Sequence, residues 1–115
     1  MQVLILINSL PYGNDRTYYA LQKAKEKLNQ GKKVVIFLYA DGVYNALKAI
    51  NPAQDEYNPL SDFKFLSKEG VSIYYCQSAG SRRGVDDITA DDIFEKSSLA
   101  NFVMLLNACE KSYCY

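Results

Sequence analysis

A cysteine and an arginine six positions apart are the residues of this sequence whose spacing suggests chemistry. Cys76 stands at the end of the apolar run in "YYCQSAGSRRG", and Arg82 and Arg83 close the loop that follows. The thiolate is the reactive form of cysteine, and a neighbouring guanidinium stabilises this anion. Such a cysteine can serve as the nucleophile of a phosphatase or carry sulfur as a persulfide. A buried, unreactive thiol before a turn is the third interpretation.

The loop after Cys76 has the composition of an anion-binding pocket. Arg82 and Arg83 supply two cations, and Gly84 and the glycine before the arginines can turn backbone N–H groups inward. Such a pocket would stabilise either a thiolate or the outer sulfur of a persulfide. Two aspartates follow at once, so a surface Arg–Asp ion pair is the competing interpretation for the arginines.

The phosphatase interpretation takes Cys76 as the nucleophile, the intervening amides as a phosphate cradle and Arg82 as a clamp. It also needs an acid for the leaving group, for which Asp41 and Asp86 are candidates. A second arginine follows Arg82 where phosphatase loops usually offer Ser or Thr. This interpretation therefore comes second to sulfur carriage.

Hydrophobic patterning predicts the elements that must position Cys76. Continuous apolar runs predict buried strands, and apolar residues at helical spacing predict helices. The predicted strands cover residues 3–8, 33–40, 71–76 and, as a short last strand, 112–115. The predicted helices cover residues 17–30, 41–50, 63–69, 97–111 and, more weakly, 86–96, with Ser61 or Asp62 as the cap before 63–69. This alternation predicts a three-layer α/β sandwich with a mainly parallel, doubly wound, flavodoxin-like sheet, folded as a single domain of residues 1–115.

In a sheet of this kind, ligands bind beyond the carboxyl ends of the strands, where the strand order switches. Cys76 ends the third predicted strand, and the loops after the first two strands reach the same edge. We therefore expect the cleft to be lined by residues of those loops, namely Pro11, Tyr12, Gly13, Asp41, Gly42, Tyr44 and Asn45.

Composition argues against several classes of function. Thirteen Lys and Arg residues balance thirteen Asp and Glu residues, so we expect no direct binding of nucleic acid or of a membrane. The sequence has no histidine and no metal-type cysteine spacing, so we expect no metal site. The first residues lack the charged start of a signal peptide. Together with an odd number of cysteines, this predicts reduced thiols and a cytoplasmic protein.

The last predicted helix is apolar nearly all round. One face carries Leu99, Phe102, Val103 and Leu106, while Met104, Leu105 and Cys109 add apolar surface elsewhere. Such a helix is buried on two sides, either by a second subunit or by deeper burial within the monomer. We treat Cys109 as a buried hydrophobic residue and leave Cys114 unassigned.

The chain resembles the DsrE/DsrF-like family of small sulfur-relay proteins, whose fold is the DsrEFH-like α/β sandwich. The resemblance rests on "PYG" at 11–13, "DGVYNA" at 41–46, "NPAQDEYNP" at 51–59 and "C…RRGV" at 76–85. The ending "ANFVMLLNACEKSYCY" has the helix-then-strand shape of the family.

This resemblance implies that Cys76 accepts sulfane sulfur as a persulfide and passes it to a partner thiol. It also implies that no metal or organic cofactor takes part, and that the partners are sulfur donor and acceptor proteins. Family members form homotrimers, homohexamers or complexes of related subunits, so the resemblance implies an oligomer. A non-catalytic oligomeric protein that binds a small anion in the same cleft stays open as an alternative.

Overall fold

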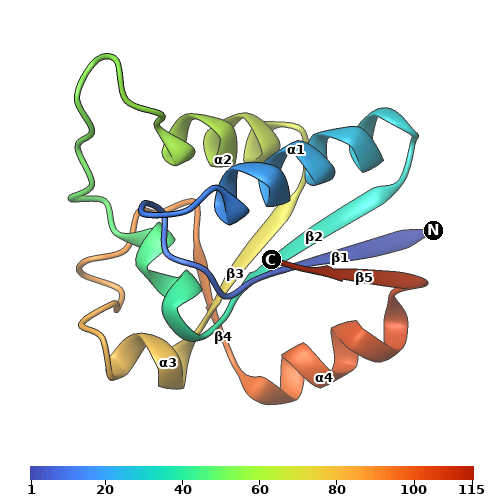
Figure 1. Ribbon diagram of the computed structural model, residues 1–115. Helices are drawn as coiled ribbons and strands as arrows, with labels where there is room; N and C mark the ends of the chain where they lie inside the picture. The colour runs from blue at the N-terminus through green and yellow to red at the C-terminus, as the bar shows by residue number, and fades with distance from the viewer.

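Three continuous runs of apolar residues form the centre of a parallel sheet in the computed structural model, which describes residues 1–115. Strands that are apolar on both faces suit a sheet that helices cover on both sides. The strands are β1 (Gln2–Ile7), β2 (Lys33–Leu38), β3 (Ser72–Cys76), β4 (Glu95–Ser97) and β5 (Lys111–Cys114), in the spatial order β4-β3-β2-β1-β5 (Figure 1). Every neighbouring pair is parallel.

Helices cover both faces of this sheet, with α1 and α2 on one side and α4 on the other (Figure 1). The helical elements are α1 (Arg16–Asn29), the 3₁₀ helix η1 (Ala40–Ala46), α2 (Pro59–Lys68), α3 (Gln77–Ser81) and α4 (Leu99–Ala108). The predicted three-layer α/β sandwich with a parallel sheet is therefore confirmed. None of the helices combines the length and the hydrophobicity that a bilayer crossing demands.

The strand order explains why α4 lies alone on its face. From β1 to β4 the chain advances across the sheet, and it then returns to place β5 on the free side of β1. Because crossovers between parallel strands are right-handed, a return in the opposite direction puts the connecting helix on the opposite face. The carboxyl ends of all strands lie along one edge, where the loops and η1 gather (Figure 1).

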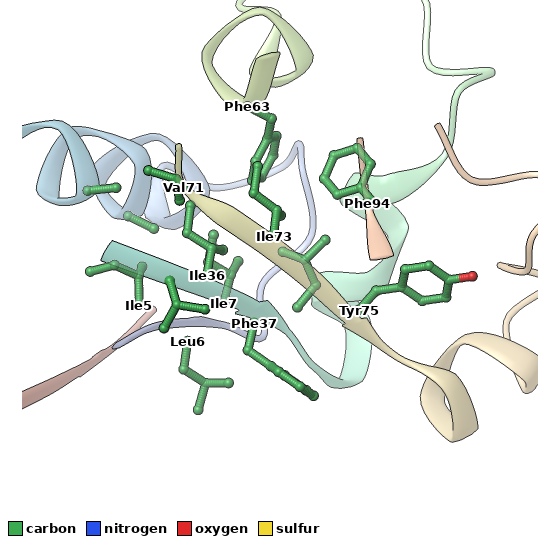
Figure 2. Packing of buried hydrophobic residues seen from close by; sticks show 14 of the residues in the cluster. Ile5, Leu6, Ile7, Ile36, Phe37, Phe63, Val71, Ile73, Tyr75 and Phe94 are labelled. Atoms are coloured by element: carbon green, nitrogen blue, oxygen red, sulfur yellow. The ribbon is translucent and has the colours of Figure 1, made fainter. Parts of the chain in front are cut away.

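Aromatic residues hold the helical layers against the sheet. Figure 2 shows Phe63 of α2 beside Phe94 on one side of the sheet, and their ring centroids are 5.1 Å apart in an edge-to-face arrangement. Leu6 and Phe37 point to the opposite side (Figure 2). There Phe37 packs against Phe102 of α4, with 5.1 Å between the ring centroids. Phe102 is therefore the residue that anchors α4 to the centre of the sheet.

Three of the predicted elements differ from the structure. The segment predicted to be weakly helical at 86–96 forms turns followed by β4, because the Asp86 carboxylate accepts hydrogen bonds from the following amides and pairing with β3 extends the chain. The helix predicted at 41–50 is the 3₁₀ helix η1, and Leu47 after it forms an antiparallel bridge with Ala90. The loop predicted between Cys76 and the arginines is the short helix α3.

The predicted cap of α2 is also wrong. The helix begins at Pro59, and the side chain of Asn58 accepts a hydrogen bond from the N–H of Leu60 at 3.1 Å. Ser61 and Asp62 lie inside its first turn. Proline suits the first helical position because its fixed φ is helical and its missing N–H would be unpaired there. The Asn–Pro pair therefore starts this helix.

Gly42 lets η1 lie directly on β1. A Cβ atom at this position would come within 2.0 Å of the carbonyl oxygen of Ile7. The backbone of η1 and the end of β1 therefore touch without an intervening side chain, which fixes the position of the loop after β2.

We expect Gly42→Ala to lower the free energy of unfolding by about 3 kcal/mol, because the backbone of η1 must move away from β1. Urea denaturation measures this change. Gly31→Ala is the matched control: Gly31 has φ 79° with open space around its Cβ position, so alanine costs about 1 kcal/mol there. Equal losses in the two variants would show that the contact with Ile7 is not tight.

Candidate functional site

Cys76 ends β3 and stands immediately before α3. Its side chain is on the α4 face of the sheet, since side chains alternate along a strand and Tyr75 lies on the side of Phe94 (Figure 2). The residue is buried, with 2% of its surface exposed. Its Sγ atom lies 3.4 Å from the hydroxyl oxygen of Ser78.

A hollow of about 280 Å³ opens beside Cys76 at the carboxyl ends of β2 and β3. Its lining residues are Tyr39, Ala40, Cys76, Ser78, Ala79, Arg82, Arg83 and Leu99. The structure thus brings together the three residues that sequence spacing singled out, the cysteine and both arginines. The reversal of strand order lies between β1 and β5, so this hollow lies at the predicted edge of the sheet and away from the switch point.

The two arginines have different surroundings. The Nε of Arg83 donates to a carboxylate oxygen of Asp41 at 3.0 Å, and one of its terminal nitrogens donates to the carbonyl of Ala79 at 3.1 Å. Arg82 is exposed and forms no ion pair. Arg83 therefore links α3 to η1 through its side chain, whereas Arg82 is a cation without an ionic partner at the rim of the hollow.

The aspartates that follow the arginines do not neutralise them. The carboxylate of Asp87 accepts from Lys96 at 3.0 Å and from the hydroxyl of Tyr75 at 3.4 Å. Asp86 accepts from backbone N–H groups of its own turn. The surface Arg–Asp pair considered from the sequence exists for Arg83 alone, and its partner is Asp41 from the loop after β2.

The residues between Cys76 and Arg82 do not form an open phosphate cradle. They form the short helix α3, for which Cys76 is the N-cap residue, so the intervening amides belong to a helical turn and not to an open loop. Gly80 allows close packing within the turn, since a Cβ there would meet the carbonyl oxygen of Val85 at 2.6 Å. Gly84 adopts φ 74° in the turn after α3 and lies outside the hollow.

The part of the hollow formed by Tyr39 and Ala40 after β2 was not predicted from the sequence. The ring of Tyr39 stacks on Phe102 with 5.9 Å between centroids and 9° between planes. Ala40 adopts φ 51°, the only positive φ at a residue other than glycine, which is an unfavourable conformation next to the site. Tyr39 and Ala40 directly follow β2, so the rule that ligands bind beyond strand ends could have found them.

Leu99 and Ser78 were also missed. Leu99 reaches the hollow because α4 begins at the carboxyl edge of the sheet, which only the order of the strands determines. Ser78 is two residues after Cys76, a spacing that becomes informative only once the segment is known to be helical.

The other residues expected to line the cleft occupy different places. Pro11, Tyr12 and Tyr44 line a separate apolar hollow of about 330 Å³ on the far side of η1. Gly13 is exposed in the loop after β1 with φ 89°. Asp41 reaches the site indirectly, through its ion pair with Arg83.

Asn45 is buried and ties two loops together. Its side-chain amide donates to the carbonyls of Ser9 at 3.2 Å and Gly42 at 3.1 Å. Neither Asn45 nor Gly42 lines the hollow of Cys76. Their contribution is to hold the loops after β1 and β2 in position.

The remaining cysteines lie away from this hollow. Cys109, which was expected to be buried within the last helix, is only partly buried and follows the end of α4 at the opposite edge of the sheet. Burial of its thiol raises the pKa of Cys109 above the usual range. Cys114 is exposed near the end of the edge strand β5. No group of three or more Cys, Asp and Glu side chains gathers as a metal site would require.

The outer face of α4 is a broad apolar surface. No residue of α4 is fully buried, which contradicts the expectation of deeper burial within the monomer. The α4 surface, as we call it, consists of Leu99, Val103, Met104 and Leu106, which are 52%, 54%, 67% and 42% exposed. Leu99 belongs both to this surface and to the hollow of Cys76.

The fold and the site define a class of small α/β proteins that carry a cysteine at the carboxyl end of a parallel strand, with arginines in the turn after it. The DsrE/DsrF-like family model matches residues 1–112, and the chain belongs to this family.

Curated relatives that match most of the chain carry the name sulfurtransferase TusD. The chain is 36% identical to the sulfurtransferase TusD of Salmonella arizonae over an alignment of 94 residues. This alignment covers 80% of this chain and 73% of that protein. The chain is 35% identical over 91 residues to the sulfurtransferase TusD of Enterobacter sp. strain 638, covering 77% of this chain and 71% of that protein.

Two solved structures share the fold. The ychN protein from E. coli superimposes with a TM-score of 0.92 at 22% identity, covering 99% of this chain and 98% of that chain. The protein MTH1491 from Methanobacterium thermoautotrophicum superimposes with a TM-score of 0.79 at 14% identity and the same coverage. At these identities the likeness concerns the fold alone.

Asp86 fixes the turn that follows the arginines. Its carboxylate accepts hydrogen bonds from the N–H groups of Thr89 at 3.0 Å and Ile88 at 2.9 Å. These bonds favour the charged form and lower the pKa of Asp86 below its usual value. The stabilisation is therefore present above the ordinary aspartate pKa of about 3.9 and is lost as the pH falls through the lowered pKa.

We expect Asp86→Asn to lower the melting temperature at neutral pH, because the amide oxygen accepts the same hydrogen bonds without the charge. The difference from the parent protein should shrink as the pH falls below the ordinary aspartate pKa and vanish once the pH lies below the lowered pKa of Asp86. Calorimetric melting over a pH series measures this. Asp55→Asn, at an exposed loop position, should leave the melting temperature nearly unchanged at each pH. A pH-independent difference for Asp86→Asn would contradict the charge-based explanation.

Proposed function

We propose that this protein is a small sulfur-relay protein that accepts sulfane sulfur as a persulfide on Cys76 and passes it to a partner thiol. One observation carries the proposal: the Cys76 thiol opens into a hollow at the strand edge that Arg82 and Arg83 also line. A persulfide or a thiolate in that hollow gains from the nearby positive charge. The sulfurtransferase relatives support the same role.

The chemistry is thiol exchange and balances without a redox partner. The Cys76 thiolate attacks the outer sulfur of a donor persulfide R–S–S–H, so a new S–S bond forms while the donor's S–S bond breaks. The electron pair leaves on the donor thiolate, and the proton stays on the transferred sulfur. An acceptor thiolate then attacks the same outer sulfur, and the Cys76 thiolate leaves. Neither a metal nor an organic cofactor is needed for either step.

The partners that this chemistry requires are proteins with accessible thiols, one as donor and one as acceptor. Balanced surface charge gives no reason to propose direct binding of nucleic acid or a membrane. Reduced thiols are maintained in the cytoplasm, which we propose as the location.

The phosphatase alternative receives less support from the geometry. It requires backbone N–H groups that converge on the sulfur, whereas the corresponding residues are helical in α3. The anion-binding, non-catalytic alternative predicts the same hollow but no covalent sulfur on Cys76, so a labelling experiment separates the two.

Incubating the purified chain with a persulfide donor should increase its intact mass by that of one sulfur atom. The added sulfur should reside on Cys76, because this is the thiol in the arginine-lined hollow. Intact-mass analysis followed by peptide mapping after alkylation measures both points, and Cys76→Ser should abolish the uptake.

The matched control is the double variant Cys109→Ala and Cys114→Ser, which retains Cys76 and should take up sulfur as the parent does. Uptake confined to Cys109 or Cys114 would refute the assignment of the site. Absence of covalent sulfur on a folded protein would favour the anion-binding alternative.

We also propose that the α4 surface joins copies of this chain in a homo-oligomer. Leu99, Val103 and Leu106 recur at helical spacing on one side of α4, and Met104 adds exposed apolar area elsewhere on the helix. Phe102 and Leu105 are the residues of α4 that pack against the core. Burying such a surface against a second copy removes it from water. Because Leu99 also lines the hollow of Cys76, the assembly would cover one side of the site.

We expect the double variant Val103→Lys and Met104→Lys to lower the oligomeric mass, because burial of two ammonium groups in an apolar interface is strongly unfavourable. Light scattering coupled to size exclusion measures the mass. Asn29→Lys, an exposed position of α1 on the opposite layer, should retain the parent's assembly. A parent protein that is monomeric at high concentration would exclude this interface.

A further inference from the structure

Ser78 is the only side chain that forms a hydrogen bond with the sulfur of Cys76. The Oγ–Sγ distance is 3.4 Å, which is within hydrogen-bonding range for sulfur. The contact arises because Cys76 directly precedes α3 and Ser78 is the second residue of its first turn. The hydroxyl therefore faces the sulfur from within the same turn.

The state of the cysteine decides the direction of this hydrogen bond. In a neutral thiol either atom can donate, and both versions are weak. A thiolate has no hydrogen, so Ser78 must be the donor, and a hydrogen bond to an anion is stronger than one between neutral groups. In a persulfide the Sγ atom again carries no hydrogen and can only accept. The hydrogen bond is therefore strongest when the sulfur carries negative charge, as it does when the thiolate attacks or leaves.

We propose that Ser78 is a catalytic residue of the sulfur transfer, an inference that rests on the proposed function. Its hydroxyl donates to Sγ when the Cys76 thiolate attacks the outer sulfur of a donor persulfide. In the second step the acceptor thiolate takes the outer sulfur, the Sγ–S bond breaks and the electron pair returns to Sγ. Ser78 stabilises this leaving thiolate through the same hydrogen bond and keeps its own proton throughout.

The arginines do not replace this contact. Arg83 is held by Asp41 and by the carbonyl of Ala79, so two of its donors are already in use. Arg82 is exposed at the rim, where water and salt screen its charge. The hydroxyl of Ser78 acts at contact distance and is aligned by the helical turn. Arginine charge and the serine hydroxyl are therefore separate contributions to the same anion.

Ser81 provides a matched control within the same helix. Its hydroxyl donates to the carbonyl of Ser78 at 3.1 Å and has no contact with the sulfur. Ser78 and Ser81 both line a second hollow beside α3, to which neither arginine contributes. Loss of Ser81 removes a hydroxyl and a hydrogen bond from α3 without changing the contact to Sγ.

The test compares Ser78→Ala, Ser78→Thr and Ser81→Ala in a protein whose Cys109 and Cys114 are replaced, so that Cys76 is the only thiol. Iodoacetamide alkylation is followed across a pH series. Ser78→Ala should react about three- to tenfold more slowly at neutral pH, with its profile displaced to higher pH and its alkaline plateau retained. Ser78→Thr and Ser81→Ala should follow the parent profile. A Ser78→Ala profile that overlays the parent overturns the proposal.

A second measurement follows the leaving step directly. Cyanide attacks the outer sulfur of the Cys76 persulfide, which releases thiocyanate and returns the electron pair to Sγ. Ser78→Ala should release thiocyanate about three- to tenfold more slowly than the parent and the Ser78→Thr variant. Equal rates in all variants overturn the role of Ser78 while leaving sulfur carriage intact. A parent that takes up no sulfur refutes the proposed function, while the alkylation profiles still decide whether Ser78 stabilises the thiolate.

Discussion

Burial of three apolar strands between helices is the constraint from which the site geometry follows. β1, β2 and β3 are covered on both faces, so their polar ends can meet solvent only at the edges of the sheet. Cys76 is the last buried residue of β3, and the chain becomes helical and exposed immediately after it. At this boundary Cys76 packs against the hydrophobic core on one side and lines the hollow together with the arginines on the other.

Two ties hold the loops around this boundary. The Arg83–Asp41 ion pair joins α3 to η1, and the contact of Gly42 with the carbonyl of Ile7 joins η1 to β1. A partly exposed ion pair contributes little to stability by itself, but it fixes which arginine remains free. Ala40, in its unfavourable left-handed conformation, turns the chain between Tyr39 and these ties. The hollow therefore has a preformed shape that the surrounding packing maintains.

The fold was largely predictable because its signals are local. The buried strands are continuous apolar runs, and the face of α1 that repeats at helical spacing is the face that packs against the sheet. The incorrect predictions concern segments in which a side-chain hydrogen bond or pairing with a distant strand outweighs the local secondary-structure preference. Asp86 holds a turn where the pattern suggested a helix, and β4 exists because it pairs with β3. Pro59 starts α2 four residues before the predicted first residue of that helix.

The amino-acid sequence is enough to place Cys76 at the end of a buried strand with arginines one short turn away, because both facts depend on spacing within a few residues. Which arginine is free follows from the folded arrangement, since the partner of Arg83 comes from the loop after β2. The same arrangement makes Tyr39 and Leu99 complete the hollow while Pro11 and Tyr12 line another one. The partner of Arg83 and the residues that line each hollow depend on the strand order and on right-handed crossovers, which bring distant loops to one edge of the sheet. No local sequence pattern indicates this arrangement.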